Sequence, residues 1–372
     1  MIPLLVVTIL STAVGFASPK QEPIWPDPVP FITGTADDAG VGGNGEGGKV
    51  QKVGYGEDDS RLGGSFVQDY GLVFRAFAEK KHYWRVDSKD TYTGRGWVKS
   101  SEIDLQLQTG DNLQLNTFNA PEVETTEYNA MVVMEPTSRF EKLVYPYGIE
   151  TVSTNDNVDY LVDYQHGSIS LDTGEDGLKR FEVAYQYPSF SLNQLQQAES
   201  DDPESIQDRY LQLPDELPDR VYQLAEEIVA DNTTRYDKVM AIEDYFRSNG
   251  YIYQIQNVAV PGQGEDYVDQ FLFDTKVGYC DNFSTSMAVM LRTLDIPTRW
   301  VKGFTGGQLA SDQPDLPNQM RAYEITNSNA HSWVEVYFPG VGWVPFEPTN
   351  GFNNPVDFYQ EVSDSVDSES EE

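Results

Sequence analysis

The sequence predicts an α+β fold in which a helix that begins with the only cysteine packs on an antiparallel sheet. Short segments of alternating apolar and polar residues between 63 and 190 are typical of strands, and no helical period is sustained there. Between 217 and 294 the apolar residues instead recur at the spacing of helices that bury one face. Alternating segments return between 298 and 346, so we expect a second set of strands after the helices.

The strand pattern of the first region is clearest in three segments. They are Leu-Val-Phe-Arg-Ala-Phe at 72–77, Ala-Met-Val-Val-Met at 130–134 and Phe-Glu-Val-Ala-Tyr at 181–185. Gly, Asn, Asp and Pro, the residues that favour turns, separate these segments. We therefore expect a β-rich domain of sandwich or barrel type at 63–190.

Three later segments predict helices, because their apolar residues share one face. They span 217–229, 235–248 and a segment that begins at Cys280 and ends before Pro297. Pro218 suits the first turn of the first helix, and Gly250 suits the end of the second. The strands expected after the third helix are 298–304, 323–326, 331–338 and 343–346.

The composition limits the classes of partner. The 372 residues include 60 acidic and 25 basic side chains, which gives a formal net charge of −35. Such a surface repels phosphate backbones and anionic lipid head groups, so the sequence argues against nucleic acid as a partner. With 39% hydrophobic and 12% aromatic residues, the chain is expected to build ordinary cores for two domains. A single cysteine excludes a disulfide within the chain.

The ends of the chain differ in composition from the regions between them. Residues 1–17 carry no charge, and this run favours a transmembrane helix, with a secretory signal peptide or a buried helix as alternatives. The predicted organisation is a transmembrane or signal-like segment at 1–18, a Pro/Gly-rich linker at 19–62, the β-rich domain at 63–190, a catalytic domain at 191–352 and an acidic tail at 353–372. This order predicts a membrane-anchored protein whose globular domains lie outside the cytoplasm.

Cys280 lies in Gly-Tyr-Cys-Asp-Asn-Phe (278–283), where a glycine-bearing loop leads into the third helix. A helix start stabilises a thiolate through its free backbone N–H groups and the helix dipole. Of the three histidines, His331 opens the strand that follows, while His82 and His166 lie in the β-rich region. A cysteine alone at a helix start is more simply a small buried apolar residue, so the imidazole is what favours a nucleophile.

A hairpin supplies a carboxylate for this histidine. If residues 339–341 form a three-residue loop, the register places Glu347 diagonally across from His331 on one face of the sheet. A slip of one residue would turn Glu347 to the other face, and Glu335 is the alternative carboxylate in that case. The order of residue types predicts a catalytic triad of Cys280, His331 and Glu347.

Four segments carry a resemblance to a known family. They are the segment 278–299, which begins Gly-Tyr-Cys-Asp-Asn-Phe, followed by Gly-Phe-Thr-Gly-Gly (303–307), Ala-His-Ser-Trp-Val-Glu-Val-Tyr (330–337) and Gly-Trp-Val-Pro-Phe-Glu-Pro-Thr (342–349). In these segments the chain resembles the bacterial transglutaminase-like core, and 83–97 is similar to a segment that precedes that core in membrane-bound members of the TgpA type. The resemblance implies a papain-like fold with Cys280 as nucleophile, His331 as base and Glu347 as the residue that orients the histidine. The family usually has aspartate at this last position.

The resemblance also implies a reaction. A thioester formed on a carboxamide or peptide carbonyl would be resolved by an amine, which is transamidation, or by water, which is hydrolysis. The partner would be a protein or peptide substrate, and an extracytoplasmic location suggests cell-wall peptide. The alternative is a non-catalytic module that binds cell-envelope partners.

No cofactor and no metal site is expected. The sequence has no H-E-x-x-H or C-x-x-C motif, and its acidic clusters lack the loop spacing of an EF-hand. Calcium dependence stays open, because irregular carboxylate sites leave no sequence pattern. Four aromatic residues flank the predicted triad and form either a cleft for the acyl donor or, more simply, part of the core: Trp300, Tyr323, Trp333 and Trp343.

Overall fold

The computed structural model describes residues 51–52, 56, 58–100, 105–108, 112–113, 115, 117–119, 121–136, 140–155, 158–172, 178–198 and 200–361. The predicted membrane or signal-like segment at 1–18, most of the linker and the tail after residue 361 lie outside these described residues. The described residues belong to one compact unit. Within them, no helix combines the length and the apolar character that crossing a membrane requires.

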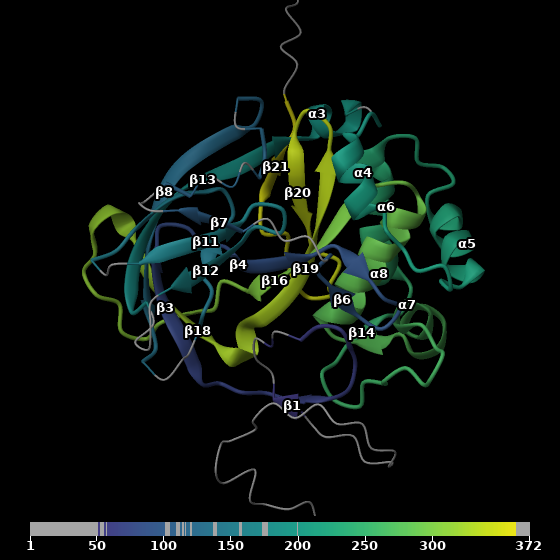
Figure 1. Cartoon of the computed structure of the whole chain (residues 1–372), viewed down its shortest axis with the longest axis horizontal. Helices are drawn as coiled ribbons and strands as arrows, with labels where there is room; N and C mark the ends of the chain where they lie inside the picture. The colour runs from purple at the N-terminus through teal and green to yellow at the C-terminus, as the bar shows by residue number, and fades with distance from the viewer. Residues whose placement is uncertain are drawn as a thin grey trace, which may run out of the picture. The chain divides into compact units, whose positions relative to one another are not determined.

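The helices follow one another between residues 192 and 293 (Figure 1). They are α3 (Leu192–Gln197), α4 (Glu204–Tyr210), α5 (Asp219–Ile228), α6 (Arg235–Ser248), α7 (Tyr267–Asp269), which continues into the π-helical η2 (Gln270–Thr275), and α8 (Cys280–Thr293). Two short 3₁₀ turns come later, η3 (Pro317–Gln319) and η4 (Asn327–Asn329). Helices α5, α6 and α7 all pack against α8, which places α8 at the centre of the helical part.

The larger sheet has seven strands and combines segments from distant parts of the chain. In sheet order they are β10 (Ile149–Ser153), β13 (Arg180–Ser191), β8 (Glu124–Met134), β3 (Leu72–Ala78), β18 (Arg321–Thr326) and β17 (Gln308–Leu309), with β21 (Asp357–Tyr359) parallel to β13. Neighbours along the main path are antiparallel. Along β13 buried and more exposed residues alternate, as expected for a sheet with one face on a core.

The second sheet carries the parts of the molecule that concern function. Its order is β20 (Gly342–Phe346), β19 (Ala330–Phe338), β16 (Thr298–Phe304), β4 (Trp84–Lys89) and β9 (Tyr145–Pro146), all antiparallel. Every residue of β16 and β4 is buried, which indicates a sheet covered on both faces. Helix α8 packs against β19 and β16 and so covers one of them.

Four smaller sheets complete the described strands. They are the sheet of β12 (Ser168–Asp172), β11 (Asp159–Asp163) and β7 (Leu105–Gln108), the pair β5 (Thr91–Tyr92) and β6 (Trp97–Val98), and two parallel pairs, β1 (Gln51–Lys52) with β2 (Phe66–Val67) and β14 (Ile252–Tyr253) with β15 (Val277–Gly278). The chain from 58 to 67, here called the strap, ends in β2 and runs past the start of α8.

The predicted fold class is confirmed, because a helix that starts at Cys280 packs on an antiparallel sheet. The helices expected at 217–229 and 235–248 correspond to α5 and α6, and all of the strands expected after Pro297 are present. The sequence analysis missed α3, α4 and α7. These contain 6, 7 and 3 residues, too few to display a helical period.

Strands from both sides of the boundary expected at residue 190 share the two large sheets. Strand β3 pairs with β18, and β4 lies between β16 and β9. Alternation along a sequence identifies a strand but not its partner, so the pattern gave no sign of these long-range pairings. Backbone hydrogen bonds therefore join the region 63–190 to the region 191–352.

A buried ion cluster beside β4 gives a prediction about stability. His166 has its Nδ1 2.8 Å from Asp163 Oδ2 and its Nε2 3.2 Å from Asp90 Oδ2. Burial opposes the charged imidazole, yet the two carboxylates outweigh it and raise the pKa of His166 above its ordinary 6.5. A raised pKa means that the charged form stabilises the fold below about pH 6.5 and that this contribution disappears as the pH rises through the folded-state pKa.

We expect wild type to be more stable than His166→Gln at acidic to neutral pH, and the difference to shrink in alkaline solution. Urea denaturation of both proteins over a pH series measures it, and because other titrating groups are common to both, the difference isolates His166. A difference that stays constant or grows with pH would contradict this assignment.

Candidate active site

Cys280 is the first residue of α8 and is buried. The helix start is held by Tyr279, whose N–H donates to Asn282 Oδ1 at 3.1 Å. Gly278 precedes it because a Cβ there would lie 2.4 Å from the same Asn282 side chain. N–H groups in the first turn of a helix have no intrahelical acceptor, so the backbone at Cys280 offers donors and a positive potential near its sulfur.

His331 and Glu347 are in direct contact. His331 Nε2 lies 2.6 Å from Glu347 Oε2, and both side chains are buried. The other carboxylate oxygen, Oε1, accepts the Thr349 N–H at 2.9 Å, which fixes the plane of the carboxylate. Cys280 is also close enough to influence the pKa of His331, while its thiol lies 3.8 Å from Asp281 Oδ1. Because Glu347 occupies Nε2, Nδ1 is the ring nitrogen left for the sulfur.

The electrostatics of this cluster favour a charged imidazole. Burial disfavours the charge, but the Glu347 carboxylate and then Cys280 outweigh it and raise the pKa of His331 to about 10. At neutral pH His331 is therefore an imidazolium between two acidic groups. This arrangement suits a thiolate–imidazolium pair, the form in which a cysteine acts as a nucleophile.

The hairpin that carries the two residues has the register expected from the sequence. Strands β19 and β20 pair from Val334 opposite Phe346 to Phe338 opposite Gly342, so residues 339–341 form the loop. Glu335, the alternative carboxylate, binds elsewhere: its oxygens lie 2.6 Å from Arg299 Nε and 3.2 Å from Arg85 Nε. Glu335 thus belongs to a buried ion network and makes no contact with His331.

Tyr83 is a member of the cluster that the sequence analysis did not single out. Its single hydroxyl proton is shared between two acceptors, Glu347 Oε2 at 3.0 Å and the Asn353 carbonyl at 3.2 Å. Its ring lies edge-on to His331, with centroids 5.4 Å apart. Burial, and then the charge of Glu347, raise its pKa far above the usual range, so the hydroxyl keeps its proton. Phe352 stacks on the imidazole, with centroids 4.3 Å apart.

If Cys280, His331 and Glu347 act together as a catalyst, Tyr83→Phe is expected to lower kcat by about threefold to tenfold, the loss associated with one hydrogen bond, and to leave KM unchanged because Tyr83 contacts Glu347. Steady-state kinetics on a glutamine peptide measure both parameters. Tyr222→Phe, at an exposed position on α5, is the matched control and should behave as wild type. A change confined to KM would show that Tyr83 contacts substrate instead.

A second polar network joins α8 to β19. Ser332, next to His331, donates to Asp281 Oδ1 at 2.6 Å, and its hydroxyl lies 2.9 Å from that of Ser284. Ser284 in turn donates to the Cys280 carbonyl at 2.7 Å. These contacts fix the distance between the helix that carries the cysteine and the strand that carries the histidine. Small hydroxyl residues give no sequence pattern for such a role.

The strap is held close to the start of α8. Asp59 accepts from Lys302 Nζ at 2.7 Å, and Lys89 Nζ lies 2.6 Å from the same carboxylate. Further along the strap, the ring of Phe66 lies edge-on to Tyr279, with centroids 4.9 Å apart. The strap therefore covers the residue that precedes the cysteine.

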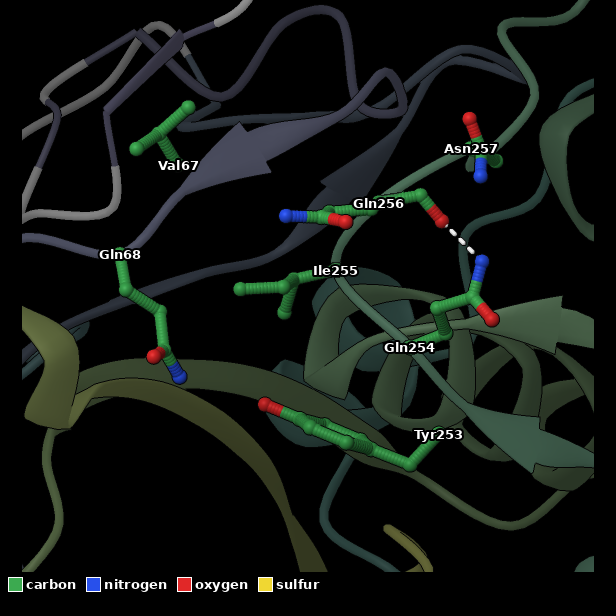
Figure 2. A pocket seen from close by; sticks show the side chains of 7 residues that line it. All are labelled: Val67, Gln68, Tyr253, Gln254, Ile255, Gln256 and Asn257. Carbon is green, nitrogen blue, oxygen red and sulfur yellow. Dashed lines mark hydrogen bonds between the residues drawn. The ribbon is translucent and has the colours of Figure 1, made fainter.

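A pocket of about 600 Å³ opens between the end of the strap and residues 253–257 (Figure 2). It is lined by Val67, Gln68, Tyr253, Gln254, Ile255, Gln256 and Asn257. Figure 2 shows the side chains of Tyr253, Ile255 and Gln256 reaching across it toward Val67 and Gln68. The sequence analysis named none of these residues.

The four aromatic residues that flank the cluster belong to the core. Trp300, Tyr323, Trp333 and Trp343 are all buried, so the simpler of the two interpretations holds for them. His82 packs against Trp84 and Tyr185, and among the described residues no hydrogen bond or ring contact joins it to Cys280. The described residues contain no group of three or more His, Cys, Asp or Glu side chains arranged to hold a metal ion.

Residues 222–348 match the transglutaminase-like superfamily. Two curated relatives align with most or all of the chain. YebA of Bacillus subtilis (strain 168), described as uncharacterized, is 42% identical over 378 residues and covers 100% of this chain. A protein-glutamine gamma-glutamyltransferase of Pseudomonas aeruginosa is 26% identical over 339 residues and covers 89% of this chain. The chain spans about half the length of these relatives, 50% of the first and 43% of the second.

Two solved structures of one periplasmic domain share the fold of this chain. The periplasmic domain of TgpA from Pseudomonas aeruginosa superimposes with a TM-score of 0.56 and 24% identity, over 75% of this chain and 88% of that one. The same domain bound to ethylmercury gives a TM-score of 0.55 over 90% of its length. With its cysteine-bearing helix packed on an antiparallel sheet, this chain contains a transglutaminase-like domain at residues 222–348.

Proposed function

We propose that this chain is a thiol enzyme that acts on carboxamide or peptide bonds through a thioester on Cys280, with His331 and Glu347 completing a catalytic triad. The observation that carries the proposal is the buried 2.6 Å contact between His331 Nε2 and Glu347 Oε2, beside a cysteine at a helix start. A module that only bound partners would need neither a charged buried imidazole nor the carboxylate that keeps it charged.

In the acylation step the Cys280 thiolate attacks the carbonyl carbon of the substrate amide, and a C–S bond forms. First-turn N–H groups of α8, including that of Cys280, stabilise the negative charge on the carbonyl oxygen. The C–N bond then breaks, and the His331 imidazolium supplies the proton with which the ammonia or amine leaves. Glu347 holds the ring oriented throughout and stabilises its charge.

In the second step an amine or a water attacks the thioester and gives its proton to His331. The C–S bond breaks, and the Cys280 thiolate and the imidazolium are restored. An amine yields a new amide bond, and water yields a carboxylate. The name of the Pseudomonas aeruginosa relative supports transamidation of protein-bound glutamine, which we propose as the first activity to assay.

We further propose that the chain is anchored in the cell membrane, with its globular part outside the cytoplasm and a protein or peptide as substrate, cell-wall peptide included. The uncharged run at 1–17 and the periplasmic origin of the solved neighbour support this. The net charge of −35 argues against nucleic acid.

Trapping the thioester tests the proposed function. Incubation with a glutamine peptide in the absence of an added amine should give a protein adduct of the peptide mass less one ammonia, observed by intact mass spectrometry. Because Cys280 is the only cysteine, no other thiol can carry the adduct, and Cys280→Ala should show none. Added amine should then release an amine-linked peptide. Absence of both adduct and product with wild type would instead favour a binding module.

A further inference from the structure

The pocket lined by Val67, Gln68 and residues 253–257 is one side chain away from Cys280, which is not itself part of the lining. Ile255 packs against the cluster formed by Cys280, Tyr279 and Val258. At the other end of the pocket, the Tyr253 ring contacts Phe352, with centroids 5.3 Å apart, and Phe352 stacks on His331. A molecule in this pocket would therefore lie against side chains that pack on the neighbours of Cys280 and His331.

The chemistry of the lining is unusual for this chain. The net charge is −35, yet none of the seven lining residues is charged. Four of them are amides, each able both to donate and to accept: Gln68, Gln254, Gln256 and Asn257. Val67 and Ile255 add aliphatic surface. Amide groups that donate and accept match the peptide backbone, and a site without charge suits a segment without charged side chains.

The backbone of β14 offers an open edge on the same side. The N–H groups of Ile252 and Gln254 donate to β15 and its neighbour Lys276, so the N–H and C=O of Tyr253 point to the opposite side. On that side the Ile255 carbonyl accepts the Phe66 N–H at 2.8 Å, which identifies it as the side of the strap and the pocket. Among the described residues, neither backbone group of Tyr253 has a hydrogen-bond partner.

We propose that this pocket binds an extended, uncharged peptide segment next to the reactive carboxamide of the acyl donor, with backbone hydrogen bonds to Tyr253 and side-chain hydrogen bonds to Gln68 and Gln256. Extended peptides commonly add to an exposed strand edge in this way. The inference rests on the proposed function for the identity of the reactive group. The volume of the pocket, about 600 Å³, lies within the range of about 300–1,000 Å³ that is common for ligand sites.

Binding and chemistry are measured separately. Fluorescence anisotropy on the full chain with Cys280→Ala reports binding of labelled peptides centred on glutamine, with neutral, lysine or glutamate residues on both sides. We expect Gln256→Glu and Gln68→Glu to weaken binding of the neutral peptide by about fivefold to tenfold, because each replaces a donor by a charged acceptor. In the same variants, the affinity for the glutamate-flanked peptide should fall further, and the affinity for the lysine-flanked peptide should fall less.

Gln223→Glu, the same substitution at an exposed position on α5, is the matched control and should change no affinity by more than about twofold. In the background with Cys280 present, alkylation by iodoacetamide, a reagent too small to need the pocket, should proceed equally in all three variants and so exclude misfolding. The proposal would be overturned if Gln68→Glu and Gln256→Glu bound the neutral peptide as tightly as Gln223→Glu does. It would also be overturned if no peptide bound to Cys280→Ala.

The two proposals fail in different ways. Peptide binding that depends on Gln68 and Gln256, without a thioester on Cys280 in wild type, would sink the proposed function and leave the pocket assignment intact. A thioester that forms with the same kcat/KM in the pocket variants and in wild type would sink the pocket assignment alone.

Discussion

Glu347→Gln is expected to lower kcat/KM for a glutamine peptide by about 10³- to 10⁴-fold, the loss seen when the carboxylate of a triad is replaced by its amide. The amide has nearly the same shape, so the fold survives. It cannot, however, hold the protonated ring, and its N–H₂ group can turn toward Nε2 and impose the wrong tautomer on His331. Steady-state kinetics with wild type and variant measure the change, and circular dichroism checks the fold.

The same variant should change the pH profile in a defined direction. In wild type the imidazolium persists up to about pH 10, since the Glu347 carboxylate is the strongest favourable influence on the pKa of His331. Loss of that carboxylate lowers this pKa, so the alkaline limb of kcat/KM should move to lower pH in Glu347→Gln. Glu347→Asp keeps the charge and should show a smaller shift. An unmoved limb in Glu347→Gln would mean that His331 is not the group that titrates.

Glu335→Ala is expected to destabilise the protein by about 3–5 kcal/mol, because it leaves the charges of Arg85 and Arg299 buried without their carboxylate. All three side chains are almost completely buried. Burial disfavours the charge on Glu335, but the two guanidinium groups outweigh it and lower its pKa. Its contribution to stability is therefore present at neutral pH and is lost as the pH falls through the folded-state pKa.

Urea denaturation at neutral pH measures the loss. Glu324→Ala is the control, because Glu324 pairs with Arg75 at 2.6 Å while 36% of its side chain stays exposed. An exposed pair contributes about 0–1 kcal/mol. Similar losses for the two variants would show that the buried network contributes no more than a surface pair, which would contradict the assignment.

The elements that could be predicted from the sequence are those whose signals are local. Alternation and helical spacing located α6, α8 and the hairpin of β19 and β20. The loop of residues 339–341 fixed the register, since a three-residue connection allows few pairings. That register was sufficient to place Glu347 beside His331. Glu335 was an alternative only because a one-residue shift in strand pairing would have turned Glu347 to the other face of the sheet.

Contacts between residues far apart in the chain could not be predicted in the same way. Tyr83 reaches Glu347 across a sequence separation of 264 residues, and Asp59 reaches Lys302 across 243. No periodicity links such positions, because each lies in a segment whose own pattern describes only its strand or loop. The pocket was missed for a related reason, since one wall comes from Val67 and Gln68 at the end of the strap and the other from residues 253–257.

The position of β4 within the second sheet limits which fragments of the chain can be expressed as folded protein. A fragment limited to residues 222–348, the region that matches the transglutaminase-like superfamily, would expose the edge of β16 and discard Tyr83, Arg85 and Asp59. An exposed edge strand of this kind promotes aggregation. The region that sequence comparison recognises is thus smaller than the set of strands that completes the second sheet, and an expressed protein should begin before the strap.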